Sequence, residues 1–211
     1  GVDDDPQFTV LHEFGFTNTI GHGVAGELLA ASDGLLYGTD GRAVFRIQTD
    51  GSNYAVVRAF TPADGVTTPM GTLIEDTNGV LYGVAGEGTA PNGAVWKMNR
   101  NGTGLAVLYT FAGVPSDGSH PSSVVEGSDG MLYGTTKFGG TNFNGTVFRV
   151  GKDGSGYSVL FQFPGYTNGF QPASPLIEGT NGALYGTTQW GGVAGLGGVG
   201  AVFKINKDGS N

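Results

Sequence analysis

Four copies of the tripeptide Leu-Tyr-Gly limit what this chain can fold into. Their tyrosines are Tyr37, Tyr82, Tyr133 and Tyr185, which lie 45, 51 and 52 residues apart. Each copy follows an Asp-Gly or Asn-Gly pair, and a full copy spans residues 128–136. Self-similarity at a fixed period of this size is typical of repeat architectures. The spacing therefore predicts that the whole chain consists of four copies of one structural unit.

Each unit contains four segments with the character of β-strands. The first is a short apolar run, at residues 27–30, 72–75, 123–126 and 175–178. The second carries Leu-Tyr-Gly, and the third begins with Ala-Val or Thr-Val, at residues 43–47, 94–98, 146–150 and 201–205. The fourth alternates between apolar and polar residues, at 8–14, 54–60, 105–111 and 157–163. Alternation with period two indicates half-buried strands, and without a sustained 3.6-residue period we expect almost no helix.

Asp-Gly and Asn-Gly pairs connect these segments at matching places. They join the first segment to the second and the third to the next alternating one, at 33–34, 50–51, 78–79, 101–102, 129–130, 153–154, 181–182 and 208–209. Such pairs between apolar runs predict β-hairpins, because both residues tolerate a positive φ. The 41 glycines of the chain fit an all-β fold with many tight turns.

Four antiparallel strands in a unit of about 50 residues predict a β-propeller with four blades. We expect one domain over residues 1–211, with blades at about 24–60, 70–111, 121–163 and 173–207. The apolar run is the shortest and least charged segment, so it is expected innermost in each blade and the alternating strand outermost. A β-sandwich or a stack of hairpins is the alternative. It is less favoured, because units so alike should have equivalent surroundings.

Residues 8–14 are a spare outer strand at one end of this arrangement. Blade 4 lacks an outer strand of its own, so the simplest prediction is that residues 8–14 dock onto it, close the ring and cover an exposed edge. The same strand could instead complete blade 4 of a neighbouring chain. Repeated head to tail, that contact would build a filament.

The composition restricts the partners of the chain. Its net charge is −8 and only 13% of its residues are charged, which argues against nucleic acid and anionic membranes, since both require a basic surface. No apolar run approaches the roughly 18 residues that suggest a membrane span. The chain has no cysteine, so an exported protein of this sequence would depend on packing rather than disulfides. We expect other copies of the chain, or surface proteins and glycans, as partners.

The segment from Gly134 to Tyr157 contains Gly-Thr-Thr, Gly-Gly, Gly-Thr-Val-Phe-Arg and Asp-Gly-Ser-Gly-Tyr in succession. With the preceding Leu-Tyr it resembles the tandem repeats of choice-of-anchor, GloVer-type bacterial exported proteins and, more distantly, propeller repeats of two-component sensors. The resemblance covers residues 8–211, and the first two units depart from it at 39–42 and 84–87. It implies a secreted or surface-associated β-propeller, and it brings no catalytic residues.

Long, unequal loops are predicted at the face opposite the Asp-Gly and Asn-Gly turns. Variable loops on a rigid scaffold often carry binding sites. Aromatic and histidine side chains gather in these loops, namely Phe16, Phe138, Phe143, Tyr166, Phe170, Trp190, His22 and His120. Exposed aromatic rings suit sugar stacking or a protein partner. The alternative is that they pack locally over the glycine-rich loops.

Other recurring residues have structural interpretations. The four tyrosines and the set Phe45, Trp96, Phe148 and Phe203 are expected to pack between blades. Glu75, Glu126 and Glu178 are expected as exposed charges at strand ends. The aspartates before glycine are turn residues rather than calcium ligands, so no metal or cofactor is predicted. Two sequons, at Asn101 and Asn144, are possible glycosylation sites.

These observations favour an extracellular structural or interaction module, with self-assembly through strand exchange of residues 8–14. A carbohydrate-binding propeller that uses the long-loop face is the alternative. An enzyme acting on polysaccharides is less favoured, because the sequence shows no credible acid–base pair, phosphate-binding loop or nucleophile elbow.

Overall fold

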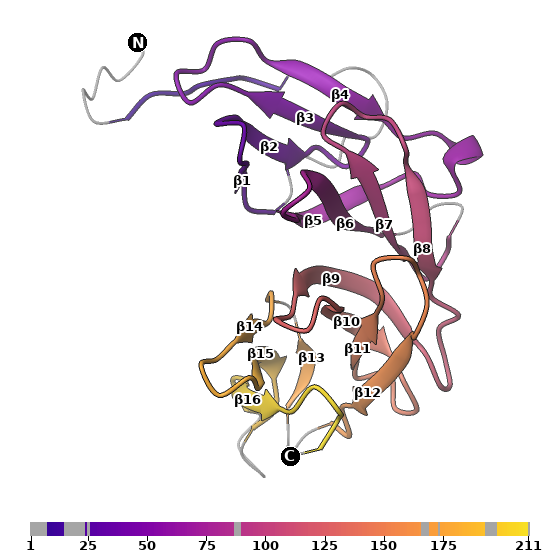
Figure 1. The fold of residues 1–211 in the computed structure, drawn as a ribbon. Coiled ribbons are helices and arrows are strands. Elements are labelled where there is room, and N and C mark those ends of the chain that lie inside the picture. Colours follow the sequence, from indigo (N-terminus) through magenta and orange to yellow (C-terminus); the bar gives the residue numbers. More distant parts are fainter. Residues whose placement is uncertain are drawn as a thin grey trace.

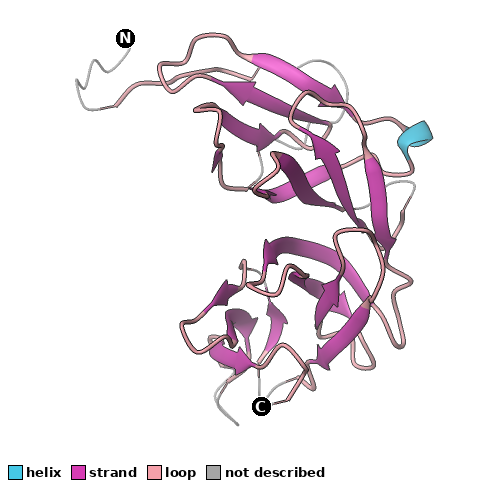
Figure 2. Cartoon of the chain, viewed as in Figure 1, coloured by secondary structure: helices cyan, strands magenta, loops and turns pink. Residues whose placement is uncertain are grey.

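The structure is a computed structural model that describes residues 8–14, 24, 26–86, 90–165, 169–172, 174–192 and 198–210. These residues form strands β1 to β16 in four antiparallel sheets and one short 3-10 helix, η1 (Pro62–Asp64). Figure 2 shows how strands dominate the chain. The predicted all-β class and the near absence of helix are confirmed. In the described part of the chain, no helix is long and apolar enough to cross a membrane.

Each sheet is one repeat unit, which we call blades 1 to 4. Blade 1 contains β1 (Leu29–Ala30), β2 (Leu36–Thr39), β3 (Ala43–Ile47) and β4 (Ala55–Ala59). Blade 2 contains β5 (Pro69–Glu75), β6 (Val80–Ala85), β7 (Ala94–Asn99) and β8 (Ala106–Thr110). Blade 3 contains β9 (Gly118–Glu126), β10 (Leu132–Gly139), β11 (Thr146–Val150) and β12 (Ser158–Gln162). Blade 4 contains β13 (Phe170–Pro172), β14 (Ile177–Glu178), β15 (Leu184–Trp190) and β16 (Ala201–Ile205).

The strand order within the blades follows the sequence. In blades 1 to 3 the strands pair in chain order, from the apolar run to the alternating strand, as predicted. The first strands meet the neighbouring blades, since β5 contacts β2 and β9, and β13 contacts β10. The four sheets therefore follow one another along an arc with the apolar runs on its inner side (Figure 1).

The hairpin turns form where the Asp-Gly and Asn-Gly pairs predict them, but their geometry differs from the expected one. Only the glycine has a positive φ, between +76° and +88° in all eight pairs, and its N–H donates to the carbonyl three residues earlier. This is a type I turn that ends in a left-handed glycine. The preceding residue keeps a negative φ and usually accepts an N–H two residues later, as Asp33 does from Leu35 at 3.1 Å.

The glycine of Leu-Tyr-Gly makes room for an aromatic ring of the next strand. In blade 3, Gly134 pairs with Phe148, and a side-chain carbon at Gly134 would lie 2.5 Å from Cζ of that ring. The same register pairs Gly83 with Trp96 in blade 2. Blades 1 and 4 repeat the pairing of this glycine with an aromatic residue. The glycine of the motif therefore allows close packing between neighbouring strands of a blade.

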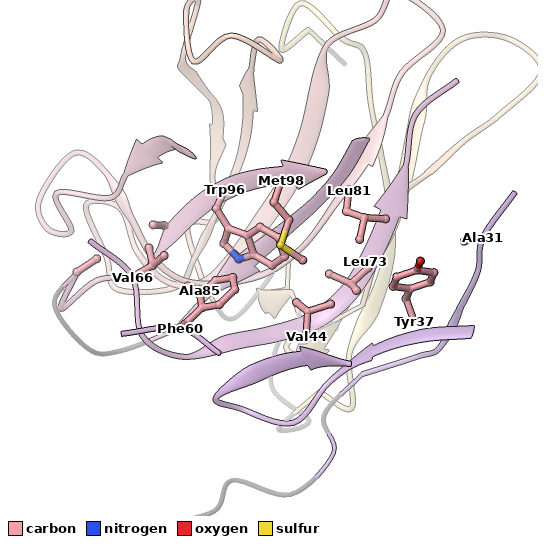
Figure 3. Close-up of a cluster of buried hydrophobic side chains, with 12 residues drawn as sticks. Ala31, Tyr37, Val44, Phe60, Val66, Leu73, Leu81, Ala85, Trp96 and Met98 are labelled. Carbon is pink, nitrogen blue, oxygen red and sulfur yellow. The ribbon is translucent and has the colours of Figure 1, made fainter. Parts of the chain in front are cut away.

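The hydrophobic core lies between the blades. Figure 3 shows one cluster in which Tyr37 and Val44 of blade 1 meet Leu73, Leu81 and Trp96 of blade 2. Two further clusters join blade 2 to blade 3 and blade 3 to blade 4. The prediction that the repeated tyrosines and aromatic residues pack between blades is confirmed in these three junctions.

The ends of the arc differ from the expectation for a closed ring. Blade 4 splits its inner strand into β13 and β14, and no strand among the described residues pairs with β16 on the side away from β15. Residues 8–14 form no ladder and contact blade 1. The predicted docking of these residues onto blade 4 of the same chain is therefore not formed, because they are held at the opposite end of the arc.

Candidate interaction surface

The three internal junctions share one aromatic contact. The phenylalanine that directly follows each outer strand packs edge-on against the third-strand aromatic ring of the next blade. Phe60 lies 5.0 Å from Trp96, and Phe111 lies 5.0 Å from Phe148, both measured between ring centroids. The blade 3 to blade 4 junction repeats this contact at 5.2 Å. The contact identifies the place that an outer strand takes on the following blade.

Residues 8–14 take this same place on blade 1. Phe14 lies 5.1 Å from Phe45, in the position of the pairs just described. His12 stacks on Tyr54 at 3.8 Å. The carbonyl of Leu11 lies against the glycine of the turn at 50–51, as the corresponding carbonyls of later outer strands do on later blades. Residues 8–14 thus sit on blade 1 as the outer strand of a preceding blade would.

At the other end of the arc, the outward face of blade 4 is uncovered. Val202 is 79% exposed, whereas its counterparts Val44, Val95 and Val147 in the first three blades are 0% exposed. Ile177, on the same blade, is 67% exposed. In blades 1 to 3 the valine belongs to a core cluster shared with another blade. Blade 4 therefore exposes an apolar surface that is a blade-to-blade interface elsewhere in the chain.

Ion pairs cross the junctions at the turn face, which is the end of the blades that carries the Asp-Gly and Asn-Gly turns. Between blades 3 and 4, the Glu178 carboxylate accepts the backbone N–H and the hydroxyl of Ser128, both at 2.7 Å. Nζ of Lys207 lies 2.7 Å from the same carboxylate. A hydrogen bond from Lys207 and those from Ser128 lower the pKa of Glu178 to about 2.

The same contacts recur in the other junctions. Glu75 binds Ser32 at 2.6 and 3.1 Å and lies 3.2 Å from Nε of Arg100. Lys152 pairs with Glu126 of its own blade 3 and lies 3.3 Å from the Asp76 carboxylate of blade 2. The prediction that these glutamates are exposed strand-end charges holds for Glu126, which is exposed, and is wrong for Glu75 and Glu178, which are half-buried. All three carboxylates are paired, because a basic residue that follows the third strand of the same blade reaches back to each of them.

We expect Glu178→Gln to destabilise the protein by up to about 1 kcal/mol at pH 7, the range of partly exposed ion pairs. The folded-state pKa of Glu178 lies below its ordinary value of 4.5. The stabilisation is therefore present above pH 4.5 and is lost as the pH falls through about 2. Urea unfolding of the variant and the parent between pH 7 and pH 2 should give curves that converge at low pH. Glu27→Gln, at an exposed position of blade 1, is the control, and a difference that does not depend on pH would contradict the prediction.

Four of the side chains proposed for the long-loop face form two separate pairs. Phe138 meets His120 edge-on at 5.2 Å on blade 3. Phe170 pairs with Trp190 across two strands of blade 4. Phe143 is 62% exposed in the loop between β10 and β11. The candidates Phe16, His22 and Tyr166 lie outside the described residues. Whether these side chains bind a ligand stays a prediction.

A buried carboxylate between blades 2 and 3 was not predicted from the sequence. Asp117 accepts the hydroxyl of Tyr109 at 2.8 Å and that of Tyr157, and the two rings stack at 3.4 Å. Burial, followed by the hydrogen bond to Asp117, raises the pKa of Tyr109 to about 12. The sequence contains a signal for Asp117, because a third set of Asp-Gly pairs precedes the inner strands, at 64–65 and 117–118. Asp117 ties the connection between two blades to both of their outer strands.

The remaining candidates can be placed in the structure. Among the described residues, no group of three or more His, Asp or Glu side chains is arranged to hold a metal ion. Asn101 is exposed in a hairpin turn, and the carbonyl of Asn144 accepts the N–H of Gln171 at 2.8 Å. Glycosylation at these two sequons stays a prediction.

Several solved structures have a similar fold. A chain of a nidogen–laminin complex is 18% identical, with a TM-score of 0.56, over 79% of this chain and 56% of its own length. A gluconolactonase from Xanthomonas campestris is 16% identical, with a TM-score of 0.57, over 90% and 60%. A GH74 enzyme from Niastella koreensis is 17% identical, with a TM-score of 0.59, over 90% and 29%. The chain thus spans less than two thirds of each of these proteins. At such identities the likeness concerns the fold alone.

The blades, their strand order and these similarities define a repeat protein of the β-propeller type. The chain belongs to the Gloeobacter/Verrucomicrobia repeat family, whose model matches residues 84–211. No curated relative matches the chain.

Proposed function

We propose that this protein is an interaction module that joins copies of itself end to end. Blade 4 of one copy would face blade 1 and residues 8–14 of the next. The observation that carries the proposal is the exposed Val202 at one end, in a position that is fully buried in the three other blades. At the other end, residues 8–14 already lie where the outer strand of a preceding blade belongs.

The backbone of β16 supports the same proposal. Its outer edge presents unpaired N–H and C=O groups in the described part of the chain, and such an edge is a template for a further strand. Strand addition would supply main-chain hydrogen bonds, and the exposed apolar side chains would supply specificity. A contact that leads from one copy to the next in this way is heterologous, so it produces a ring or a filament.

The place of action that we propose is outside the cell. An acidic surface and a cysteine-free chain are compatible with an exported protein that depends on packing. Carbohydrate binding at the long-loop face and activity on polysaccharides stay predictions from the sequence.

We expect Val202→Asp to weaken self-association by at least about tenfold, because the new carboxylate would have to be buried in the junction without a partner. Sedimentation velocity over a range of protein concentrations measures the effect. Val202 is exposed in the single chain, so the thermal unfolding midpoint of the variant should stay close to that of the parent.

Val114→Asp is the matched control, because Val114 is 43% exposed in the connection between blades 2 and 3, away from both ends of the arc. This variant should associate as the parent does. A parent protein that stays monomeric at every concentration would contradict the proposal, as would equal effects of the two substitutions.

A further inference from the structure

A stacking rule holds in two of the three junctions between successive outer segments, which are residues 8–14, 54–60, 105–111 and 157–163. There the ring of the fifth residue of one segment meets the ring of the first residue of the next, whereas Arg58 and Leu105 occupy these positions between blades 1 and 2. Tyr109 stacks on Tyr157 at 3.4 Å between blades 2 and 3. His12 stacks on Tyr54 at 3.8 Å between residues 8–14 and blade 1. Two of the junctions are thus fixed by a pair of flat rings at equivalent positions.

Phe161 is the fifth residue of the outer segment of blade 3, residues 157–163. Its ring meets Phe163 of its own strand edge-on at 5.1 Å, as Tyr109 meets Phe111 at 5.3 Å. By the stacking rule, its partner would be the first residue of an outer strand on blade 4. An open cavity of about 470 Å³ lies beside Phe161 and is also lined by Leu160 and Gln162.

Phe8 is the first residue of the spare strand and is 72% exposed. The spacing from Phe8 to Phe14 equals that from Tyr157 to Phe163 in blade 3. A strand that pairs with β16 of one copy can therefore place Phe8 at Phe161 of that copy. At the same time it can keep the contact of Phe14 with blade 1 of its own copy.

The proposed junction would depend on this aromatic contact more than the internal junctions do, because of the residues at its turn face. Blade 1 has Ala30 and Thr49 at the positions that Glu178 and Lys207 occupy in blade 4. A junction between blade 4 and blade 1 would therefore lack the ion pair that each internal junction has. Recognition would depend on the apolar face and on the rings of the outer strands.

We propose that Phe161 is the binding site for the first residue of an incoming outer strand, and that Phe8 of a second copy occupies it. This inference rests on the proposed self-association and assigns the residues that select the partner. The second copy is favoured over the same chain, because the chain's own residues 8–14 are held on blade 1 and leave Val202 exposed.

The test compares Phe8→Ala and Phe161→Ala by sedimentation velocity. Each variant should raise the dissociation constant by about five- to tenfold, the range of an aromatic pair, and the double variant should add little to either. Phe8→Tyr should associate like the parent, because blade 3 has Tyr157 at this position. Phe8 is exposed, so its substitution reports on association without a loss of folding. Phe143→Ala removes a ring that is 62% exposed in a loop and is the control.

The outcomes separate the two proposals. If Val202→Asp weakens association but Phe8→Ala and Phe161→Ala do not, the assignment of this contact is wrong and the self-association stands. Additive effects of the two phenylalanine substitutions would also overturn the assignment, since they would show that the rings do not meet. A monomeric parent would overturn both proposals.

Discussion

Replacing Trp96 by alanine is expected to lower the free energy of unfolding by about 3–5 kcal/mol, the range for large aromatic side chains in a core. Trp96 is fully buried between blades 1 and 2, where Phe60 packs edge-on against its ring. Its cluster also contains Val44 of blade 1 and Leu73 of blade 2. These neighbours belong to two sheets that cannot collapse independently, so a cavity would remain. Urea unfolding followed by far-ultraviolet circular dichroism measures the loss.

Trp96→Phe is the matched control, because the other three blades have phenylalanine at this position. The smaller ring loses packing area, but it also removes an indole N–H that is buried without a hydrogen-bond partner in the described structure. We therefore expect a loss of less than about 1.5 kcal/mol, as for other tolerated core exchanges. Equal losses for alanine and phenylalanine would contradict the packing explanation.

Gly134→Ala is expected to cost about 3 kcal/mol, at the upper end of the usual range for overpacking. The new methyl group would lie 2.4 Å from the carbonyl oxygen of Ser123 and 2.5 Å from the ring of Phe148. One neighbour is backbone of the paired inner strand and the other is a fully buried ring, so neither can yield easily. Urea unfolding of the variant against the parent measures the cost.

Gly130→Asn provides the comparison within the same hairpin. Gly130 has a φ of +78° and no atom within 4 Å of the position that a side chain would take. Asparagine tolerates this backbone conformation better than most residues, so the loss should stay below about 1 kcal/mol. A larger effect at Gly130 than at Gly134 would show that backbone strain, rather than steric overlap, explains the glycines of this motif.

Much of the fold could be predicted because the repeated motifs involve residues that are close together in the sequence. The Leu-Tyr-Gly motif, the alternating strands and the Asp-Gly and Asn-Gly pairs each depend on neighbouring residues, so their positions predict strands, hairpins and blade order. The pairs located the hairpin turns but did not specify the turn type, since Asp-Gly suits more than one. In the eight pairs of this protein only the glycine adopts a positive φ, and the preceding side chain usually accepts a nearby N–H.

The candidate surface was predicted less completely, because its contacts join residues about one repeat apart. Glu178 reaches Ser128, 50 residues away, and Glu75 reaches Ser32, 43 residues away. A glutamate at a strand end looks the same in sequence whether it is exposed or paired. Its partner becomes visible only when two blades are placed side by side.

By itself the sequence determined that four like units of four strands follow one another. It also determined that residues 8–14 are a spare outer strand that precedes the first unit. Only the tertiary structure decided where residues 8–14 lie and that the four blades form an open arc. The reason is that strand and turn preferences are set over a few residues, whereas the closure of a ring depends on how four junctions add up in space. As a result, Val202 is exposed at one end of the arc, and Phe14 packs against Phe45 at the other.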